Sequence, residues 1–404
     1  MRLLLATNHL GLGGSESYLL TVAEQLDRLG HEVAIYAAER GPGSDLAVER
    51  NLEQIGEAEL GDRDYDAALV QDAGVSLEVA DRCPGVPQLF VAHSAKFDLQ
   101  APPRLAGVVE TIVTMNDRVA RRMRSFDIDA EIVRLRQPID TERFVPRGSL
   151  PDHARGALLL SNTPNADRLE MLEAACAEAC LELKRLGGLS GQTTDIRPAI
   201  ADAEIVIGYG RSILEAMACG RAAYVYDWKG GDGWVTPESY PAIEADGFAG
   251  SAAAEIFDAA RLADDLRRYS AGMGPVNHDL VMTGHKASDH VERLLELFGG
   301  MAKPPARPPA PLQEMARLVR LEWRARVDIH SLVHENAHLR GLLTESECKA
   351  IEAHEEARKN AEAAARQAAE TARSYESTLS WRVTRPVRAI APLLNRARRR
   401  RRSP

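Results

Sequence analysis

Two segments of this chain run from a short apolar stretch through closely spaced glycines into a helical pattern, and this arrangement constrains the fold most. The first joins an expected strand at 3–6 to a helix over 16–29, and the second joins an expected strand at 204–207 to a helix over 212–218. Strands that feed helices in this way belong to parallel sheets covered by helices. The sequence therefore predicts an α/β protein.

Further apolar runs repeat this alternation up to about residue 300. Strands are expected at 33–37, 67–70, 89–92, 112–115 and 132–135, and then near 157–160, 181–186 and 223–226. Helices are expected at 166–179, 255–269 and 284–297. The predicted organisation is a Rossmann-like domain (1–150), a second Rossmann-like domain (151–300), a proline-rich linker (301–311), a coiled coil (312–373) and a basic amphipathic tail (374–404).

A heptad pattern follows the linker. Between Met315 and Leu343, the positions that step alternately by three and four residues are apolar except for Glu322 and Asn336. An asparagine at one seam position fixes the register of a parallel two-stranded coiled coil. The pattern predicts a homodimer, and the alternative is a single solvated helix, which the alanines that fill the seam past Cys348 favour.

Charge and cysteine content exclude several classes of protein. The formal net charge of −9 argues against general nucleic-acid binding, which needs a basic face. Five cysteines with no pair separated by two residues argue against a disulfide framework, and no apolar run reaches the length of a membrane span. The sequence therefore predicts a cytoplasmic protein with no nucleic-acid partner.

The C-terminus is basic, because six arginines lie within residues 396–402 after an amphipathic stretch that begins near Trp381. Attraction to anionic lipid is worth about 1 kcal/mol per basic residue, which predicts peripheral binding at the inner face of the membrane. The alternative is a solubilising tail, since Pro386 and Pro392 interrupt any helix.

The first glycine loop is a candidate phosphate site. Gly13 and Gly14 precede a helix N-terminus, whose free amides and partial positive charge favour an anion. The loop departs from the dinucleotide fingerprint because Glu16 replaces the third glycine, although Glu39 lies where an acidic ribose ligand is placed in that pattern. A nicotinamide-dependent oxidoreductase, or a tight turn without a ligand, are the alternatives.

The second glycine loop repeats the arrangement and adds a cation. Gly208 and Gly210 precede Arg211 and Ser212, and Ser212 is expected to cap the helix. Such a site suits a pyrophosphate. Glu215 lies one turn further along and is expected to accept hydrogen bonds from sugar hydroxyls, whereas the alternative is a carboxylate that only complements the helix dipole.

Two further segments invite a functional interpretation. Residues 227–234 combine Lys229 with Trp228 and Trp234, which suits a wall against a base or a sugar, and the alternative is a turn whose tryptophans pack in the core. Residues 334–338 match the zinc-peptidase pattern, but they lie in the coiled-coil helix without an evident third ligand. The sequence therefore predicts no metal site there.

Together, these motifs resemble the family-4 glycosyltransferases over about residues 1–300. The resemblance depends on Gly13-Gly14-Ser15-Glu16, on His93 after a strand, on Thr114-Met115-Asn116-Asp117, on Pro138-Ile139-Asp140-Thr141-Glu142-Arg143-Phe144 and on the segment 208–220. It implies the GT-B fold, in which a cleft separates two Rossmann domains, the second holds the nucleotide-sugar donor and the first holds the acceptor.

The resemblance and the two glycine loops together define the expected site. Donor binding is assigned to Gly13, Gly14, Gly208, Gly210, Arg211, Ser212, Glu215 and Lys229, and acceptor binding to Ser15 and Glu16. His93 is the expected catalytic residue, because the matching histidine of the family lines the reacting sugar. No metal or cofactor is implied beyond the nucleotide-sugar co-substrate, since cations and helix dipoles stabilise the leaving diphosphate.

Two positions depart from the family pattern. The family's glutamate eight residues before Glu215 is Ile207 here, and the family's Arg and Lys pair after the first strand of the second domain is missing from residues 161–168. The charge of the leaving group is then met by Arg211, Lys229 or Arg168, or is not met at all.

The sequence predicts a metal-independent glycosyltransferase of the hexosyltransferase type. It transfers a sugar, with retention, from a nucleotide sugar to a glycan or lipid-linked acceptor in cell-surface polysaccharide biosynthesis. The departures leave an inactive GT-B-like scaffold, acting as a coiled-coil dimer, as the alternative, and an NAD-dependent oxidoreductase as the third interpretation.

Overall fold

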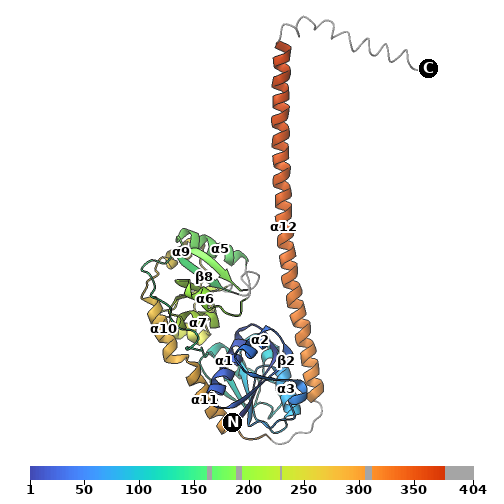
Figure 1. Cartoon of the computed structure of the whole chain (residues 1–404), viewed down its shortest axis with the longest axis vertical. Helices are drawn as coiled ribbons and strands as arrows, with labels where there is room; N and C mark the ends of the chain where they lie inside the picture. Colours follow the sequence, from blue (N-terminus) through green and yellow to red (C-terminus); the bar gives the residue numbers. More distant parts are fainter. Residues whose placement is uncertain (162–165, 188–192, 228–229, 305–311, 378–404) are drawn as a thin grey trace, which may run out of the picture. The chain divides into compact units, whose positions relative to one another are not determined.

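The computed structural model describes residues 1–161, 166–187, 193–227, 230–304 and 312–377 (Figure 1). Residues 1–323 form one compact unit, in which the strands make a seven-stranded and a five-stranded sheet. The second unit begins at Arg324 and continues the helix α12 (Leu312–Ser377). The predicted α/β class, with two helix-covered sheets followed by a long C-terminal helix, is confirmed.

The first lobe is built on a fully parallel sheet in the order β3-β2-β1-β4-β5-β6-β7. Its strands are β1 (Arg2–Leu10), β2 (Glu32–Arg40), β3 (Glu53–Ile55), β4 (Ala67–Val70), β5 (Gln88–Ala92), β6 (Thr111–Thr114) and β7 (Glu131–Arg134). Its helices include α1 (Gly14–Arg28), α2 (Pro42–Glu49), α3 (Ala73–Arg82) and α4 (Asp117–Arg124). The central strands are apolar on both faces because helices cover both sides of the sheet.

The second lobe has the strand order β12-β11-β10-β8-β9. Its strands are β8 (Gly156–Leu160), β9 (Glu182–Leu186), β10 (Ile205–Gly208), β11 (Ala222–Asp227) and β12 (Gly230–Trp234), of which only β12 is antiparallel to its neighbour. Its helices are α5 (Ala166–Glu178), α6 (Arg197–Ala201), α7 (Arg211–Ala218), α8 (Tyr240–Asp246), α9 (Ala259–Leu266) and α10 (Met273–Gly284).

Two segments of the second lobe differ from the sequence predictions, although the alternative that a tryptophan packs in the core holds for Trp234. The segment ending at Trp234 is a strand rather than a glycine-rich turn, and Trp234 packs edge-on against Tyr224 with ring centroids 5.0 Å apart. Because this indole is buried and donates to the Asp265 carbonyl at 2.9 Å, Trp234 belongs to the core. The helix expected over 284–297 is α11, displaced by three residues because the backbone at Lys286 pairs with Ile139, and the preceding helix α10 was not expected.

The chain returns to the first lobe at its end. Helix α11 (Ala287–Gly300) packs Val291, Leu294 and Phe298 into the core that covers one face of the first sheet. The sequence-based limits 151–300 assign this helix to the second domain. The first turns of α12 also pack on this lobe, where Leu312 and Ala316 contact Leu77 of α3.

Beyond these turns, α12 is rich in exposed apolar side chains. Within residues 324–377 these include Ile329, Leu332, Leu339 and Leu343 of the predicted seam. In the part of the chain that the structure describes, no helix combines the length and the apolar character of a membrane span. The predicted linker and basic tail largely fall outside the described residues.

The strand orders identify where a ligand would bind. In each sheet the order reverses next to one strand, between β1 and β4 in the first and between β8 and β10 in the second. Loops that leave neighbouring strands in opposite directions at such a point open a crevice at the carboxyl edge of the sheet. The glycine loop after β1 and the glycine loop after β10 both lie at these points.

Candidate functional site

A cavity of about 500 Å³ lies between the two lobes. The first lobe contributes Gly13 and Gly14, and the second contributes Ser161 after β8 together with Gly210 and Arg211 at the start of α7. The structure therefore brings the two predicted glycine loops to one cavity, with the N-termini of α1 and α7 both at its wall.

The β1–α1 loop leaves room for a ligand. A Cβ added at Gly14 would meet no atom within 4 Å, so there is open space beside Gly14, which lines the cavity at the start of α1. Glu16 instead lies against Gly13 and accepts a hydrogen bond from the Ser15 hydroxyl at 2.9 Å. Partial positive charge at the helix N-terminus favours an anion at this position.

Glycine is required before α7. Gly210 has φ 63° and ψ −137°, a conformation that side-chain-bearing residues rarely adopt, and it is the N-cap of the helix. The prediction that Ser212 caps α7 is wrong, because its hydroxyl donates to the Tyr209 carbonyl at 2.9 Å and no side chain among the described residues caps the helix. The first amides of α7 are thus left without a side-chain cap, at the wall of the cavity.

Arg211 and Glu215 form an ion pair of 2.8 Å between Nε and Oε1, and each side chain is only 9% exposed. Arg211 also donates to the Pro138 carbonyl at 2.9 Å and to the Thr21 hydroxyl at 3.0 Å, so it joins α7 to α1. Burial raises the pKa of Glu215, and the charge of Arg211 opposes this shift. The guanidinium group of Arg211, which the sequence assigned to the donor, therefore already binds Glu215, Pro138 and Thr21.

A smaller cavity of about 220 Å³ shares Gly14, Gly210 and Arg211 with the first and contains His93 and Ser15. His93 follows β5, is hydrogen-bonded to the Gln71 side chain, and contacts Tyr18 edge-on with ring centroids 5.1 Å apart. Burial, and then the charge of Arg211, lower the pKa of His93 to about 3. At neutral pH the imidazole is uncharged, so it offers a polar contact but no imidazolium proton.

The structure adds cavity residues that the sequence did not single out. Asp195 and Arg197 follow β9 and form a two-bond ion pair with distances of 2.7 and 2.8 Å, and the hydrogen bonds from Arg197 lower the pKa of Asp195. Arg50 at the end of α2 and Arg143 in the crossing between the lobes also line the cavity. Arg143 lies in the quoted family motif, whereas Arg50 and Asp195 carry no local sequence signal.

Several predicted residues cannot be placed in the site. Lys229 and Trp228 lie outside the described residues, as do the side chains of His334 and His338 in the zinc-like pattern. Ile207 is fully buried among apolar side chains, so it makes none of the polar contacts of a glutamate. Gly208 packs against β8, where an added Cβ would lie 2.7 Å from the Leu160 carbonyl oxygen.

Comparison with known proteins gives the fold. No protein-family model matches the sequence, and no curated protein is significantly similar to it. The crystal structure of HepE from Anabaena in complex with UDP matches with a TM-score of 0.55 at 12% identity, covering 74% of this chain and 100% of that one. The glycosyltransferase of Rickettsia africae matches with a TM-score of 0.51 at 12% identity, covering 74% and 97%. The chain therefore has the two-lobed GT-B fold that was predicted from the sequence.

Proposed function

We propose that the protein is a glycosyltransferase that uses a nucleotide-sugar donor. The observation that carries this proposal is the convergence of two uncapped helix N-termini, one from each lobe, on the 500 Å³ cavity. Such a site binds a diphosphate through backbone amides. HepE, which shares the fold, is described in complexes with UDP, with UDP-glucose, and with UDP and glucose.

The arrangement supports a division of the donor between the two cavities. The larger cavity, with Ser161 and the Asp195–Arg197 pair, would hold the nucleoside, and the diphosphate would lie at Gly13, Gly14 and the start of α7. The smaller cavity, with neutral His93, would hold the sugar and the acceptor hydroxyl beside Ser15.

The reaction would break the bond between the sugar C1 and the diphosphate oxygen. The electron pair stays on the diphosphate, an acceptor hydroxyl oxygen bonds to C1, and its proton passes to the departing diphosphate or to water. Helix dipoles and cations stabilise the charge that develops on the leaving group, so no metal is required in this proposal. Retention and membership of family 4 are part of the proposal and come from the sequence motifs.

The C-terminal region suggests where the enzyme would act. The arginine cluster at 396–402 supports attraction to an anionic membrane surface, where a lipid-linked acceptor for surface polysaccharide would be found. The exposed apolar stripe of α12, with Leu332, Leu339 and Leu343, supports pairing with a second copy. Glu335 and Arg340 stand five residues apart, as facing g and e positions of a parallel pair do.

Donor binding is the direct test. Calorimetric titration with UDP, GDP, ADP and CDP, each followed by the matching nucleotide sugars, should identify one nucleoside diphosphate with micromolar affinity. A chain that binds none of them is not a glycosyltransferase of this kind. Radiolabelled sugar transfer to membrane lipids would then distinguish turnover from binding.

An inactive scaffold is the second candidate, and one observation favours it. Arg211 and Glu215 satisfy each other, and Ile207 takes the place of an expected polar contact. If cells that carry both His93→Ala and Glu215→Gln keep their surface glycan, the scaffold interpretation is supported.

A further inference from the structure

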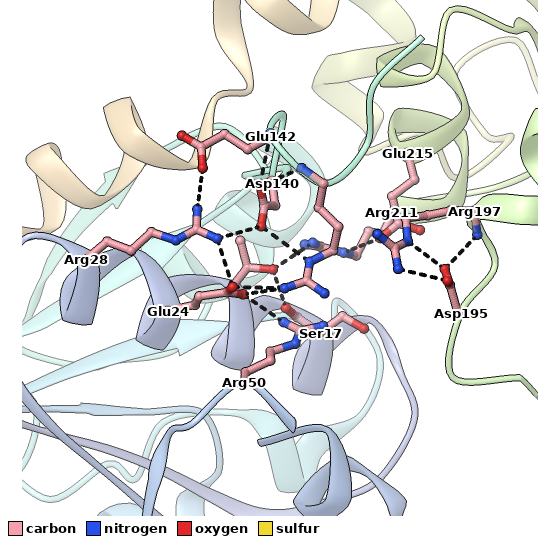
Figure 2. A network of polar contacts seen from close by, with 12 residues as sticks. Ser17, Glu24, Arg28, Arg50, Asp140, Glu142, Asp195, Arg197, Arg211 and Glu215 are labelled. Carbon is pink, nitrogen blue, oxygen red and sulfur yellow. Dashed lines mark hydrogen bonds and ion pairs between the residues drawn. The ribbon is translucent and has the colours of Figure 1, made fainter. Parts of the chain in front are cut away.

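One carboxylate at the edge of the larger cavity is shared by three arginines. Glu24 of α1 accepts from Arg28 at 2.8 Å and from Arg50 at 3.4 Å (Figure 2). It also accepts from Arg143 at 2.9 and 3.0 Å. Arg50 and Arg143 line the cavity. Arg28 lies on the outer side of this group, 38% exposed, and has a second partner in Glu142.

The other cavity arginines are already matched. Arg211 is held by Glu215 and by two oxygens of α1 and the lobe crossing, and Arg197 makes both bonds of a two-point pair with Asp195. Among the described lining residues, the guanidinium group with the weakest compensation is therefore that of Arg50, whereas Arg143 is paired with both Glu24 and Asp140.

Arg50 is the less satisfied of the two. Its side chain is 15% exposed, and among the described residues its buried Nε has no hydrogen-bond acceptor and its one ion pair is the long one to Glu24. Burial lowers the pKa of this guanidinium, and the neighbouring charge of Arg143 lowers it further. Two like charges held together in a cavity are stabilised by an anion that accepts from both.

Arg143 is held in place from two sides. Its Nε lies 3.5 Å from Asp140, which is 2% exposed and also accepts from the Glu142 and Arg143 amides at 3.1 Å. The crossing between the lobes therefore fixes the backbone of Arg143, while the guanidinium group points to Glu24.

We propose that Arg50 and Arg143 are the cationic contacts for the diphosphate of the donor, and that Glu24 holds both guanidinium groups at the cavity. This inference rests on the proposed function. It assigns to the first lobe and the lobe crossing the role of the family's Arg and Lys pair, which residues 161–168 of the second lobe lack. Guanidinium groups suit this role because their planar donors bind phosphate oxygens in pairs.

The test compares ligands that differ only in phosphate. The nucleoside diphosphate that binds the wild-type chain most tightly among UDP, GDP, ADP and CDP is titrated into each variant, and so is the matching nucleoside. Arg50→Gln and Arg143→Gln should each weaken diphosphate binding roughly 10- to 100-fold. Binding of the nucleoside should stay unchanged, because it makes no phosphate contact.

Arg28→Gln is the matched control, since it removes an arginine from the same carboxylate without reaching the cavity. Its affinity for the diphosphate should equal that of the wild type. Arg50→Lys and Arg143→Lys keep the positive charge and the ion pair, so they are controls for loss of binding through misfolding. The lysine variants should bind the diphosphate more tightly than the glutamine variants but more weakly than the wild type.

The outcomes separate the two proposals. If the wild type binds a nucleoside diphosphate and both glutamine variants bind it equally well, the arginine contact is refuted while the proposed function stands. Equal loss in Arg28→Gln would also refute it, because the network would then act only on the fold. A wild-type chain that binds no nucleoside diphosphate refutes the proposed function, and the arginine contact with it.

Discussion

Acidification should destabilise this fold through two buried histidines at the lobe crossings. His285 and His290 each use Nδ1 to donate to a backbone carbonyl, of Gln137 at 2.7 Å and of Arg136 at 2.9 Å. Their Nε2 atoms accept from Tyr240 at 2.8 Å and from Tyr18 at 2.9 Å. A proton added at Nε2 would place a positive charge in a buried site and force the tyrosine hydroxyl to accept instead of donate, so burial holds both imidazoles neutral.

The size of the effect follows from the pKa values. Burial lowers the pKa of each histidine from 6.5 to about 4. Because the folded pKa is depressed, the stabilisation is present above pH 6.5 and is lost as the pH falls toward 4. Between pH 7 and pH 5, this corresponds to about 2 kcal/mol of unfolding free energy for each histidine.

Urea unfolding at pH 7 and pH 5 measures this loss. In His290→Asn, the amide nitrogen can replace Nδ1 as donor to Arg136 and cannot titrate. The variant should start less stable at pH 7 but lose about 2 kcal/mol less than the wild type between the two pH values. The exposed His153→Asn is the control and should keep the wild-type loss. An unchanged pH dependence in His290→Asn would refute the argument that His290 is held neutral.

Three further predictions concern packing, charge and assembly. Gly43→Ala should lower the free energy of unfolding by about 2 kcal/mol, because its Cβ would lie too close to the Gly11 carbonyl oxygen. A urea-unfolding midpoint equal to that of the wild type would show that α2 is not fixed there. Glu215→Ala should lower stability by about 3 kcal/mol in the same assay, since it leaves a buried arginine unpaired, whereas Glu215→Gln should cost less. Light scattering should give a dimer for the full chain and a monomer for residues 1–323; a monomeric full chain would contradict pairing through α12.

The sequence predicts those parts of the fold that depend on local pattern. β4 runs from Ala67 to Val70 as expected, and the helix of the first glycine loop ends before Gly30, whose φ of 80° fits the predicted C-terminal position. α2 and β3 escape prediction because α2 begins with Pro-Gly-Ser, which is typical of a turn, and β3 has only three residues, two of them polar. β12 escapes because three glycines within it read as a turn.

The residues of the candidate site can likewise be predicted only where they depend on local sequence. The glycine loops are visible in the sequence because each is a local strand–turn–helix unit. The partners that surround them come from distant parts of the chain: Arg211 meets Thr21 across 190 positions, and Arg143 meets Glu24 across 119. No periodic pattern in the sequence predicts contacts between residues so far apart in the chain. The sequence could therefore name Arg211 as a phosphate ligand, but could not foresee that its donors are engaged between the lobes.

Because α11 and α12 return to the first lobe, they also determine the order in which the two lobes can complete their folding during synthesis. Val291, Leu294 and Phe298 of α11 and Leu312 of α12 complete apolar layers on the first lobe. During synthesis the first sheet emerges from the ribosome early, yet these layers stay open until residues past 312 have left the exit tunnel. The intervening lobe can reach its native state sooner, so the first lobe completes its packing last.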